Sequence, residues 1–238
     1  MKAKAKTDRT TPPGRAEHTL RIIGGRWRQA KLAYHGDLVT RPMKHRVREA
    51  IFNLVGPAVQ GKHAVDLFAG TGALGLEALS RGAAGATFIE RHLPTADVVK
   101  QNIAALGAGE QSELLITSAF LWSKRDLPAI KGPTSDHATQ QTDARLPLPP
   151  AATPWVVFVS PPYAFFVDRR DEMIALVDAL RAHAPADSLI VVETDERFDF
   201  ALLPGRVRPD RHSDGWDVRE YPPARVGVWR CGVGGGPD

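Results

Sequence analysis

Short apolar runs alternate with amphipathic segments through most of the chain. The runs have the length of buried strands, and they predict strands at residues 64–68, 86–89, 114–116, 155–159 and 188–192. Between and before them, apolar residues recur every three or four positions, which predicts helices at residues 44–54, 73–81, 95–106 and 171–183. Because strands and helices alternate, we expect an α/β fold with a mostly parallel sheet that is covered on both faces.

The N-terminal region combines a predicted hairpin with strong positive charge. Residues 20–23 and 30–34 are strand candidates on either side of a glycine pair, which predicts a small β-hairpin extension. Residues 1–48 contain thirteen Lys or Arg and three acids, a net +10, whereas the whole chain carries +4, so the remainder carries −6. This asymmetry suggests a polyanionic partner on the N-terminal side. A solubilising tail with ordinary surface arginines is the alternative.

The C-terminal region completes the expected sheet. Val207 and residues 225–229 flank a turn at 213–215, which predicts an antiparallel pair at one edge and brings the sheet to seven strands. Changes of composition then divide the chain into segments: a disordered basic tail (1–17), the hairpin extension (18–40), the main domain (41–232) with a flexible, aperiodic insertion (131–154), and a disordered tail (233–238).

Several classes of protein are disfavoured by composition. Cys231 is the only cysteine, which excludes an intrachain disulfide, and the eight histidines have no close ligand spacing, so we expect no metal site. No apolar run approaches the roughly 18 residues that a membrane span needs. The basic N-terminus has no apolar stretch behind it, as a secretory signal would. We therefore expect a cytoplasmic protein without a membrane segment, and a monomer.

A glycine-rich loop joins the first predicted strand of the main domain to a helix. Residues 66–75 read DLFAGTGALG, in which the GxGxxG pattern permits a tight turn and close approach of a ligand to the backbone. A nicotinamide dinucleotide would place its pyrophosphate at the helix N-terminus. S-adenosylmethionine (AdoMet) has no phosphate, but it carries a sulfonium and an ammonium group. The pattern Asp-x-Phe-x-Gly-x-Gly favours AdoMet over a dinucleotide and over purely structural glycines.

Two acids near this loop suit AdoMet. Asp66, on the strand that enters the loop, would place a carboxylate near the amino-acid end of the cofactor. Glu90 ends the second strand, where an acid can accept hydrogen bonds from both ribose hydroxyls. For Glu90 alone, a solvated acid at a strand end is an equally good interpretation.

A second motif, Ser160-Pro161-Pro162-Tyr163, follows the fourth strand at the edge of the sheet where ligands bind in open α/β folds. The two prolines stiffen the backbone and leave carbonyl groups free as acceptors. A side-chain oxygen and a proline carbonyl could accept both protons of an amino group on a base, and Tyr163 could stack on the ring. A proline stop with a core tyrosine is the alternative. After the glycine loop, the motif favours methylation of an exocyclic amino group.

Further segments have the features of one known family. In addition to the Pro-Pro-Tyr motif, these segments are RIIGGRWR (21–28), RP (41–42), RVREAIFN (46–53) and DLFAGTGALGLEALSRG (66–82). In these segments the chain resembles the RsmD-type methyltransferases, which modify the 2-amino group of guanine 966 in 16S ribosomal RNA. The resemblance covers about residues 20–230 without the insertion.

The resemblance implies a Rossmann-like, AdoMet-dependent methyltransferase fold whose N-terminal hairpin extension helps to hold RNA, with 16S rRNA or the small ribosomal subunit as partner. The implied catalytic residues are Ser160, Pro161, Pro162 and Tyr163. The implied cofactor-binding residues are Asp66, Phe68, Ala69, Gly70, Thr71, Gly72, Glu90, Arg91, Ser118 and Ala119. The candidates for contacts with RNA phosphates are Arg21, Arg26, Arg28, Lys31, Arg41 and Arg46.

Three positions depart from the family pattern. Ser160 stands where the family usually has Asp or Asn, Ser118 where an acid often contacts the adenine amino group, and Met43 where the family has Thr. A serine hydroxyl can accept an amino proton but carries no charge. Serine at this position also resembles enzymes that methylate cytosine amino groups in DNA. The alternatives are therefore methylation of another base, at cytosine N4 or adenine N6 in DNA or RNA, or a non-catalytic RNA-binding homologue.

Overall fold

The computed structural model describes residues 20–34, 45–130, 149–210 and 213–232. One seven-stranded sheet organises them, in the order β3-β2-β1-β4-β5-β7-β6. Its strands are β1 (His63–Asp66), β2 (Gly85–Ile89), β3 (Ser112–Leu115), β4 (Trp155–Val159), β5 (Leu189–Asp195), β6 (Asp217–Tyr221) and β7 (Ala224–Arg230). β1 to β5 run parallel, whereas β7 pairs antiparallel with β5 and with β6. The strand order reverses between β1 and β4, where open sheets of this kind bind ligands.

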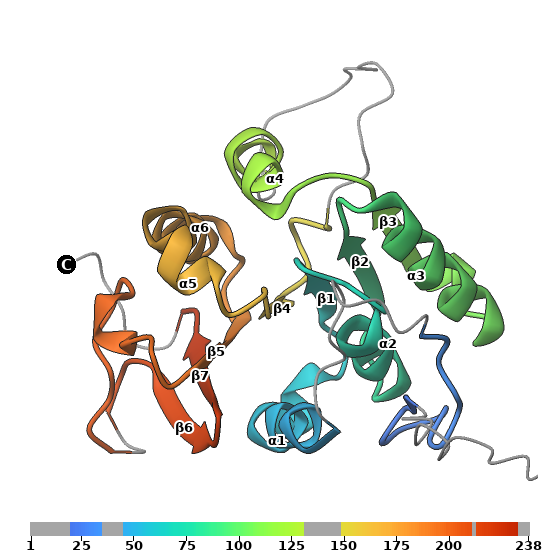
Figure 1. Cartoon of the computed structure of the whole chain (residues 1–238), viewed down its shortest axis with the longest axis horizontal. Helices are drawn as coiled ribbons and strands as arrows, with labels where there is room; N and C mark the ends of the chain where they lie inside the picture. The colour runs from blue at the N-terminus through green and yellow to red at the C-terminus, as the bar shows by residue number, and fades with distance from the viewer. Residues whose placement is uncertain (1–19, 35–44, 131–148, 211–212, 233–238) are drawn as a thin grey trace, which may run out of the picture.

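Helices cover both faces of the sheet (Figure 1). The α-helices are α1 (His45–Val55), α2 (Ala73–Ser80), α3 (Leu93–Ala105), α4 (Ala119–Arg125), α5 (Phe165–Asp168) and α6 (Arg170–His183). Short 3-10 helices follow or link them: η1 (Gly56–Val59), η2 (Gly109–Gln111), η3 (Leu127–Ala129) and η4 (Phe200–Leu202). α1, α2 and α3 lie on one face, and α4, α5 and α6 lie on the other (Figure 1). This arrangement confirms the α/β fold with a mostly parallel, seven-stranded sheet.

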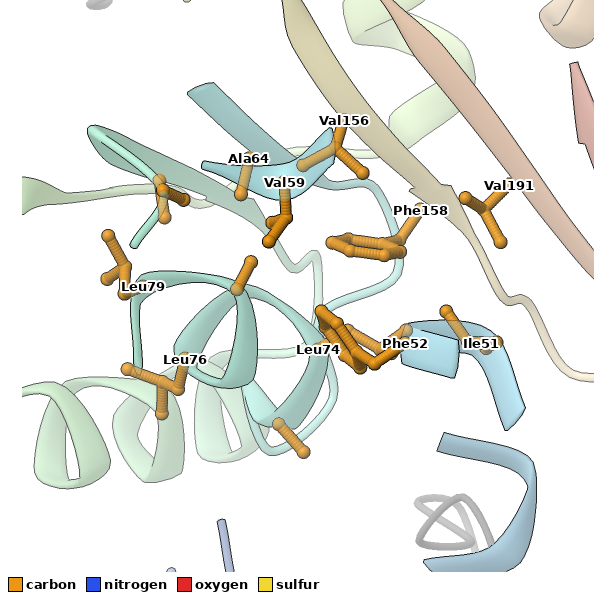
Figure 2. Packing of buried hydrophobic residues seen from close by; sticks show 14 of the residues in the cluster. Ile51, Phe52, Val59, Ala64, Leu74, Leu76, Leu79, Val156, Phe158 and Val191 are labelled. Atoms are coloured by element: carbon orange, nitrogen blue, oxygen red, sulfur yellow. The ribbon is translucent and has the colours of Figure 1, made fainter. Parts of the chain in front are cut away.

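The core consists of one apolar cluster on each face of the sheet. On the face of α1 and α2, Phe52 and Leu74 point toward Phe158 of β4, as Figure 2 shows. The ring centroids of Phe52 and Phe158 lie 5.6 Å apart. On the other face, Trp122 and Trp155 are completely buried in the second cluster. Burial of these side chains on both faces stabilises the sheet and fixes the ends of its strands in space.

The predicted helices and parallel strands are all present, with ends that differ by no more than three residues. The largest difference is at β5, which was predicted to end at Val192 but continues to Asp195 because it pairs with β7 over its whole length. α4 was not predicted, since its apolar residues are consecutive and show no helical spacing. α5 has only four residues and was not predicted either.

The expected antiparallel pair at the sheet edge is present, but its partners differ from the prediction. β7 includes the predicted residues 225–229, and it lies between β5 and β6. Val207 forms only an isolated bridge with Trp216. The edge strand is β6, whose sequence DVREY has a largely polar, half-exposed pattern typical of an edge. That polarity is why the sequence did not reveal it.

Residues 20–34 form the predicted hairpin in a reduced form. Arg21 and Lys31 make an isolated antiparallel bridge. Around it, the backbone N–H of Leu32 donates to the carbonyl of Leu20 (2.8 Å), and that of Ile22 donates to the carbonyl of Ala30 (3.0 Å). The antiparallel pairing is therefore present, but neither side is long enough to form a regular strand.

The buried carboxylate of Glu77 on α2 holds this hairpin on the main domain. It accepts hydrogen bonds from the backbone N–H groups of Ile23 (2.7 Å) and Gly24 (2.8 Å). The guanidinium of Arg48 on α1 lies 3.8 Å from the same carboxylate and donates through Nη2 to the carbonyl of Arg21. Both charged side chains are inaccessible to solvent, so their partners fix the position of the hairpin.

Several predicted features lie outside the described residues: the two tails (1–17 and 233–238), residues 35–40 of the extension, Arg41, Met43 and residues 131–148 of the insertion. The last part of the predicted insertion, residues 149–154, is described and belongs to the fold. The indole N–H of Trp155 donates to the carbonyl of Pro150 (2.9 Å).

Candidate active site

The glycine loop joins β1 to α2 at the carboxyl edge of the sheet. Gly72 is the N-cap residue of α2 and has φ 77°, in the left-handed region that favours glycine. Gly75 has a packing role, since a Cβ there would lie 2.4 Å from the ring of Phe88. The side-chain amide of buried Asn102 donates to the carbonyl of Thr71 (2.9 Å) and holds the loop. The loop is thus preformed, and α2 packs directly on β2.

Asp66 ends β1 beneath this loop, with 1% of its surface exposed. Its Oδ2 accepts a hydrogen bond from the backbone N–H of Gly75 (3.1 Å). Its Oδ1 has no hydrogen-bond partner among the described residues. Burial raises the pKa of Asp66 to about 7. The hydrogen bond from Gly75 and, more weakly, the backbone N–H of Phe68 oppose this shift, while the charge of Glu90 adds to it. A buried carboxylate with an unsatisfied oxygen is well suited to receive a cationic group.

Glu90 follows β2 and faces the same loop. Its Oε2 accepts from the backbone N–H of Gly70 (3.0 Å), and its Oε1 accepts from that of His92 (2.9 Å). These contacts fix the carboxylate in place, which a solvated acid at a strand end would not require. Because each carboxylate oxygen has a further lone pair, Glu90 can still accept two hydroxyl groups of a ligand.

The remaining predicted cofactor residues lie in the loop itself, just after β2 or at the start of α4. Ser118 is the half-buried N-cap residue of α4, and Ala119 is buried behind it. Phe68 lies in an aromatic group with Phe120 and Phe165, at centroid distances of 5.9 and 6.2 Å. The other predicted residues differ in burial: Ala69 and Thr71 are buried, and Arg91 is exposed.

The Ser160-Pro161-Pro162-Tyr163 motif leaves the carboxyl end of β4 and converges on a residue that the sequence reasoning missed. The hydroxyl of Ser160 donates to Oε2 of Glu193, and the phenol of Tyr163 donates to Oε1 of Glu193 (2.6 Å). Burial raises the pKa of Glu193, and the hydrogen bonds from Ser160 and Tyr163 oppose this shift. The sequence feature that could have revealed Glu193 is an acid directly after the apolar run of β5, at the same sheet edge as the motif.

Strand register brings the two motifs together. Asp66 of β1 pairs with Phe158 of β4, and Val159 of β4 pairs with Val192 of β5. The glycine loop and Ser160 therefore leave neighbouring strands at the same edge, where the strand order reverses. Ligands held by the two motifs would lie side by side.

The predicted RNA-binding residues lie outside the two motifs at this edge. Within the described residues, four of them lie on the hairpin and one on α1: Arg21, Arg26, Arg28, Lys31 and Arg46. The hairpin turn contacts the C-terminal end of α2, where Ser80 Oγ accepts from the backbone N–H of Trp27 (3.0 Å). The glycine loop is at the other end of this eight-residue helix, about 12 Å away at 1.5 Å per residue.

The basic side chains of the hairpin differ in the contacts that they make within the protein. Arg26 stacks on the ring of Trp27, with its guanidinium carbon 4.0 Å from the ring centroid, and donates to Gln111. Arg28 and Lys31 are exposed.

The turn of the hairpin lies at the C-terminal end of α2. At the other end of the hairpin, the backbone of Ala33 bonds to the side chain of Asn102, which also bonds to Thr71 of the glycine loop. Residues on the hairpin could thus contact a polyanion that extends along α2 toward the sheet edge.

Known proteins are similar to this chain in sequence and in fold. A family model described as "Conserved hypothetical protein 95" matches residues 20–131. The chain is 32% identical over 187 residues to the ribosomal RNA small subunit methyltransferase D of Haemophilus influenzae, an alignment that covers 78% of this chain and 83% of that protein. It is 49% identical over 90 residues to the Escherichia coli protein of the same name, covering 38% of this chain and 46% of the relative. This second alignment spans only about half of the E. coli relative.

A solved structure, described as a putative methyltransferase yhhF from Escherichia coli, has the same fold. It superposes with a TM-score of 0.61 at 28% sequence identity, covering 90% of this chain and 99% of that one. In the part of the chain that the structure describes, no helix is long and apolar enough to cross a membrane. No cluster of three or more His, Cys, Asp or Glu side chains in these residues could hold a metal ion.

Proposed function

Because the chain belongs to the family of the ribosomal RNA small subunit methyltransferase D, we propose that it transfers a methyl group from AdoMet to an exocyclic amino group in small-subunit ribosomal RNA. The finer proposal is the N2 amino group of a guanine in 16S rRNA, with guanine 966 as the position that the family resemblance implies. The observation that carries the proposal is the meeting of the glycine loop and the Ser160–Tyr163 motif at the carboxyl ends of neighbouring strands.

AdoMet fits the acids beside the glycine loop. The unpartnered oxygen of Asp66 suits its ammonium group, Glu90 suits its ribose hydroxyls, and the hydroxyl of Ser118 suits its adenine amino group. When bound, AdoMet supplies a methyl group attached to a sulfonium. A dinucleotide fits less well, because two carboxylates flank the loop where a pyrophosphate would lie and would repel it.

The Ser160–Tyr163 motif would hold the base. The oxygen of Ser160 and a carbonyl of the proline pair would accept the two protons of the amino group, whose lone pair is otherwise delocalised into the ring. Tyr163 would stack on the base and fix it in line for direct transfer. A covalent route through cysteine is not supported, since the backbone N–H of Cys231 bonds to Ser188 at the opposite end of β5. Burial also raises the pKa of the Cys231 thiol to about 11.

Labelled methyl transfer tests this proposal. Purified protein with radiolabelled AdoMet should label 16S rRNA, offered both as naked RNA and in assembled small subunits. Tyr163→Ala should lower the rate by at least about fivefold, since base stacking contributes about 1–3 kcal/mol. Asp97→Ala, an exposed change on α3, is the control and should transfer at the wild-type rate. Absence of label from both RNA substrates would refute the proposed activity. In that case, calorimetry with AdoMet would show whether the protein still binds the cofactor. Absence of binding heat would favour a non-catalytic RNA-binding homologue.

A further inference from the structure

Glu193 forms a buried backing for the base-binding motif. Its side chain is 4% exposed at the carboxyl end of β5. One carboxylate oxygen accepts the hydroxyl proton of Ser160, and the other accepts that of Tyr163 at 2.6 Å. A buried carboxylate costs free energy unless it is hydrogen-bonded. Both carboxylate oxygens of Glu193 accept hydrogen bonds from residues of this one motif, so Glu193 fixes the positions of the Ser160 and Tyr163 side chains.

These contacts decide what the hydroxyl of Ser160 can offer to a ligand. A free serine hydroxyl can either donate a proton or accept one, so by itself it would bind an amino group and a carbonyl oxygen with little discrimination. With its only proton directed at Glu193, Ser160 presents lone pairs alone. The pair of Ser160 and Glu193 then offers the acceptor that a single Asp or Asn offers elsewhere in the family.

We propose that Glu193 is a positioning residue that commits Ser160 to the role of hydrogen-bond acceptor and thereby selects an exocyclic amino group over a carbonyl or an unsubstituted ring position. This inference rests on the proposed function of the same site. It assigns Glu193 no direct contact with the base and no step in the reaction. Its second contact, to Tyr163, holds the stacking ring in the orientation that presents the amino group to Ser160.

Nucleoside binding tests this selection without turnover. The protein is saturated with S-adenosylhomocysteine and titrated by calorimetry with three nucleoside pairs that differ by one amino group: guanosine and inosine, adenosine and purine riboside, cytidine and pyrimidin-2-one riboside. Wild type should bind the amino-bearing member of one pair about tenfold more tightly, as one satisfied hydrogen bond allows. Glu193→Met, similar in length but apolar, should abolish that preference, because Ser160 is then free to donate.

Three further variants separate positioning from a general loss of structure. Glu193→Gln keeps one acceptor oxygen and should retain part of the preference. Ser160→Asp combined with Glu193→Met supplies its own carboxylate acceptor and should restore it. Glu196→Gln changes an exposed acid three residues away and should leave it unchanged. Thermal unfolding and S-adenosylhomocysteine affinity verify that each variant is folded.

The outcomes distinguish this inference from the proposed function. An unchanged amino preference in folded Glu193→Met would overturn the role of Glu193, even if wild type methylates rRNA. A Glu193-dependent preference for adenosine or cytidine would support Glu193 and contradict methylation of guanine. A wild type with no amino preference in any pair would also overturn the inference, while labelled transfer would still decide the activity.

Discussion

At the scale of single residues, two buried carboxylates define the two halves of the site. Asp66 ends β1, Glu193 lies near the carboxyl end of β5 in the same sheet, and burial raises the pKa of both. Their surroundings nevertheless differ. Both oxygens of Glu193 accept hydrogen bonds from Ser160 and Tyr163, whereas Oδ1 of Asp66 has no partner among the described residues. Such perturbed groups are typical of functional sites, and the unsatisfied one is where a cationic ligand gains most.

The raised pKa of Asp66 predicts pH-dependent cofactor binding. In the free protein the proton on Asp66 stabilises the fold below the unfolded-state pKa of 3.8, and this contribution is lost as pH rises through about 7. An ammonium group favours the carboxylate, so binding below pH 7 must release a proton. The affinity for S-adenosylhomocysteine should therefore fall about tenfold between pH 7.5 and pH 6.

Calorimetry in two buffers of different ionisation enthalpy measures both the affinity and the proton release. Asp66→Asn cannot titrate, so its affinity should be lower and nearly independent of pH over this range. An equally steep pH dependence in Asp66→Asn would assign the effect to another group and contradict the role of Asp66.

At the scale of elements, Glu77 connects three parts of the chain that are distant in sequence. It lies on α2, receives two backbone N–H groups of the hairpin and faces Arg48 of α1. Burial lowers the pKa of Arg48, and the charge of Glu77 opposes this shift. Arg48 Nε and Nη1 have no hydrogen-bond partner among the described residues, so its charge depends largely on Glu77. The N-terminal hairpin is thus attached by polar contacts in addition to its apolar side chains.

Glu77→Ala should destabilise the protein by about 3–5 kcal/mol, because it leaves the buried charge of Arg48 without its partner. Denaturant unfolding measures this loss. Hydrogen exchange should accelerate first at the amides of Ile23 and Gly24, which lose their acceptor. Asp97→Ala removes an exposed ion pair with Lys100 and should change stability little. Equal stability of the two variants would show that Glu77 does not hold the hairpin.

The sequence predicts those elements whose pattern reflects burial alone. β2 and β4 are continuous buried runs, and α6 has a clear apolar repeat, so their existence follows from local pattern. β6 and the end of β5 could not be predicted in this way, because their pairing with β7 compensates for polar residues. Glu193 was missed for the same reason: an acid after an apolar run reads as a strand end, and only the neighbouring strand shows what it binds.

At the scale of the whole molecule, the glycine loop and the Ser160–Tyr163 motif meet at one sheet edge. The positive hairpin lies along α2, with its turn at the C-terminal end of that helix and Ala33 joined to the glycine loop through Asn102. The prediction of each motif followed from local sequence, but their juxtaposition depends on the strand order around β1 and β4. The position of the hairpin depends on contacts with residues of α2 that lie more than fifty positions later in the sequence. An RNA that reaches both would extend over the face of α2, as a large structured substrate can.

Charge reversal on the hairpin tests this arrangement. Arg26→Glu with Arg28→Glu should weaken binding to 16S rRNA and reduce the salt dependence of binding, because each phosphate contact contributes one released counterion. S-adenosylhomocysteine affinity should not change, since both residues lie away from the glycine loop. Unchanged rRNA methylation and binding in this variant would remove the hairpin from the RNA interface.

The most direct test of the central claim is nucleoside analysis of the RNA after reaction. 16S rRNA treated with the protein and labelled AdoMet is digested to nucleosides and separated by liquid chromatography with mass spectrometry. The account predicts that the label is found in N2-methylguanosine, and that Tyr163→Ala strongly reduces it. Label on a ring nitrogen, a ring carbon or a ribose hydroxyl would contradict the assignment of the Ser160–Tyr163 motif to an exocyclic amino group.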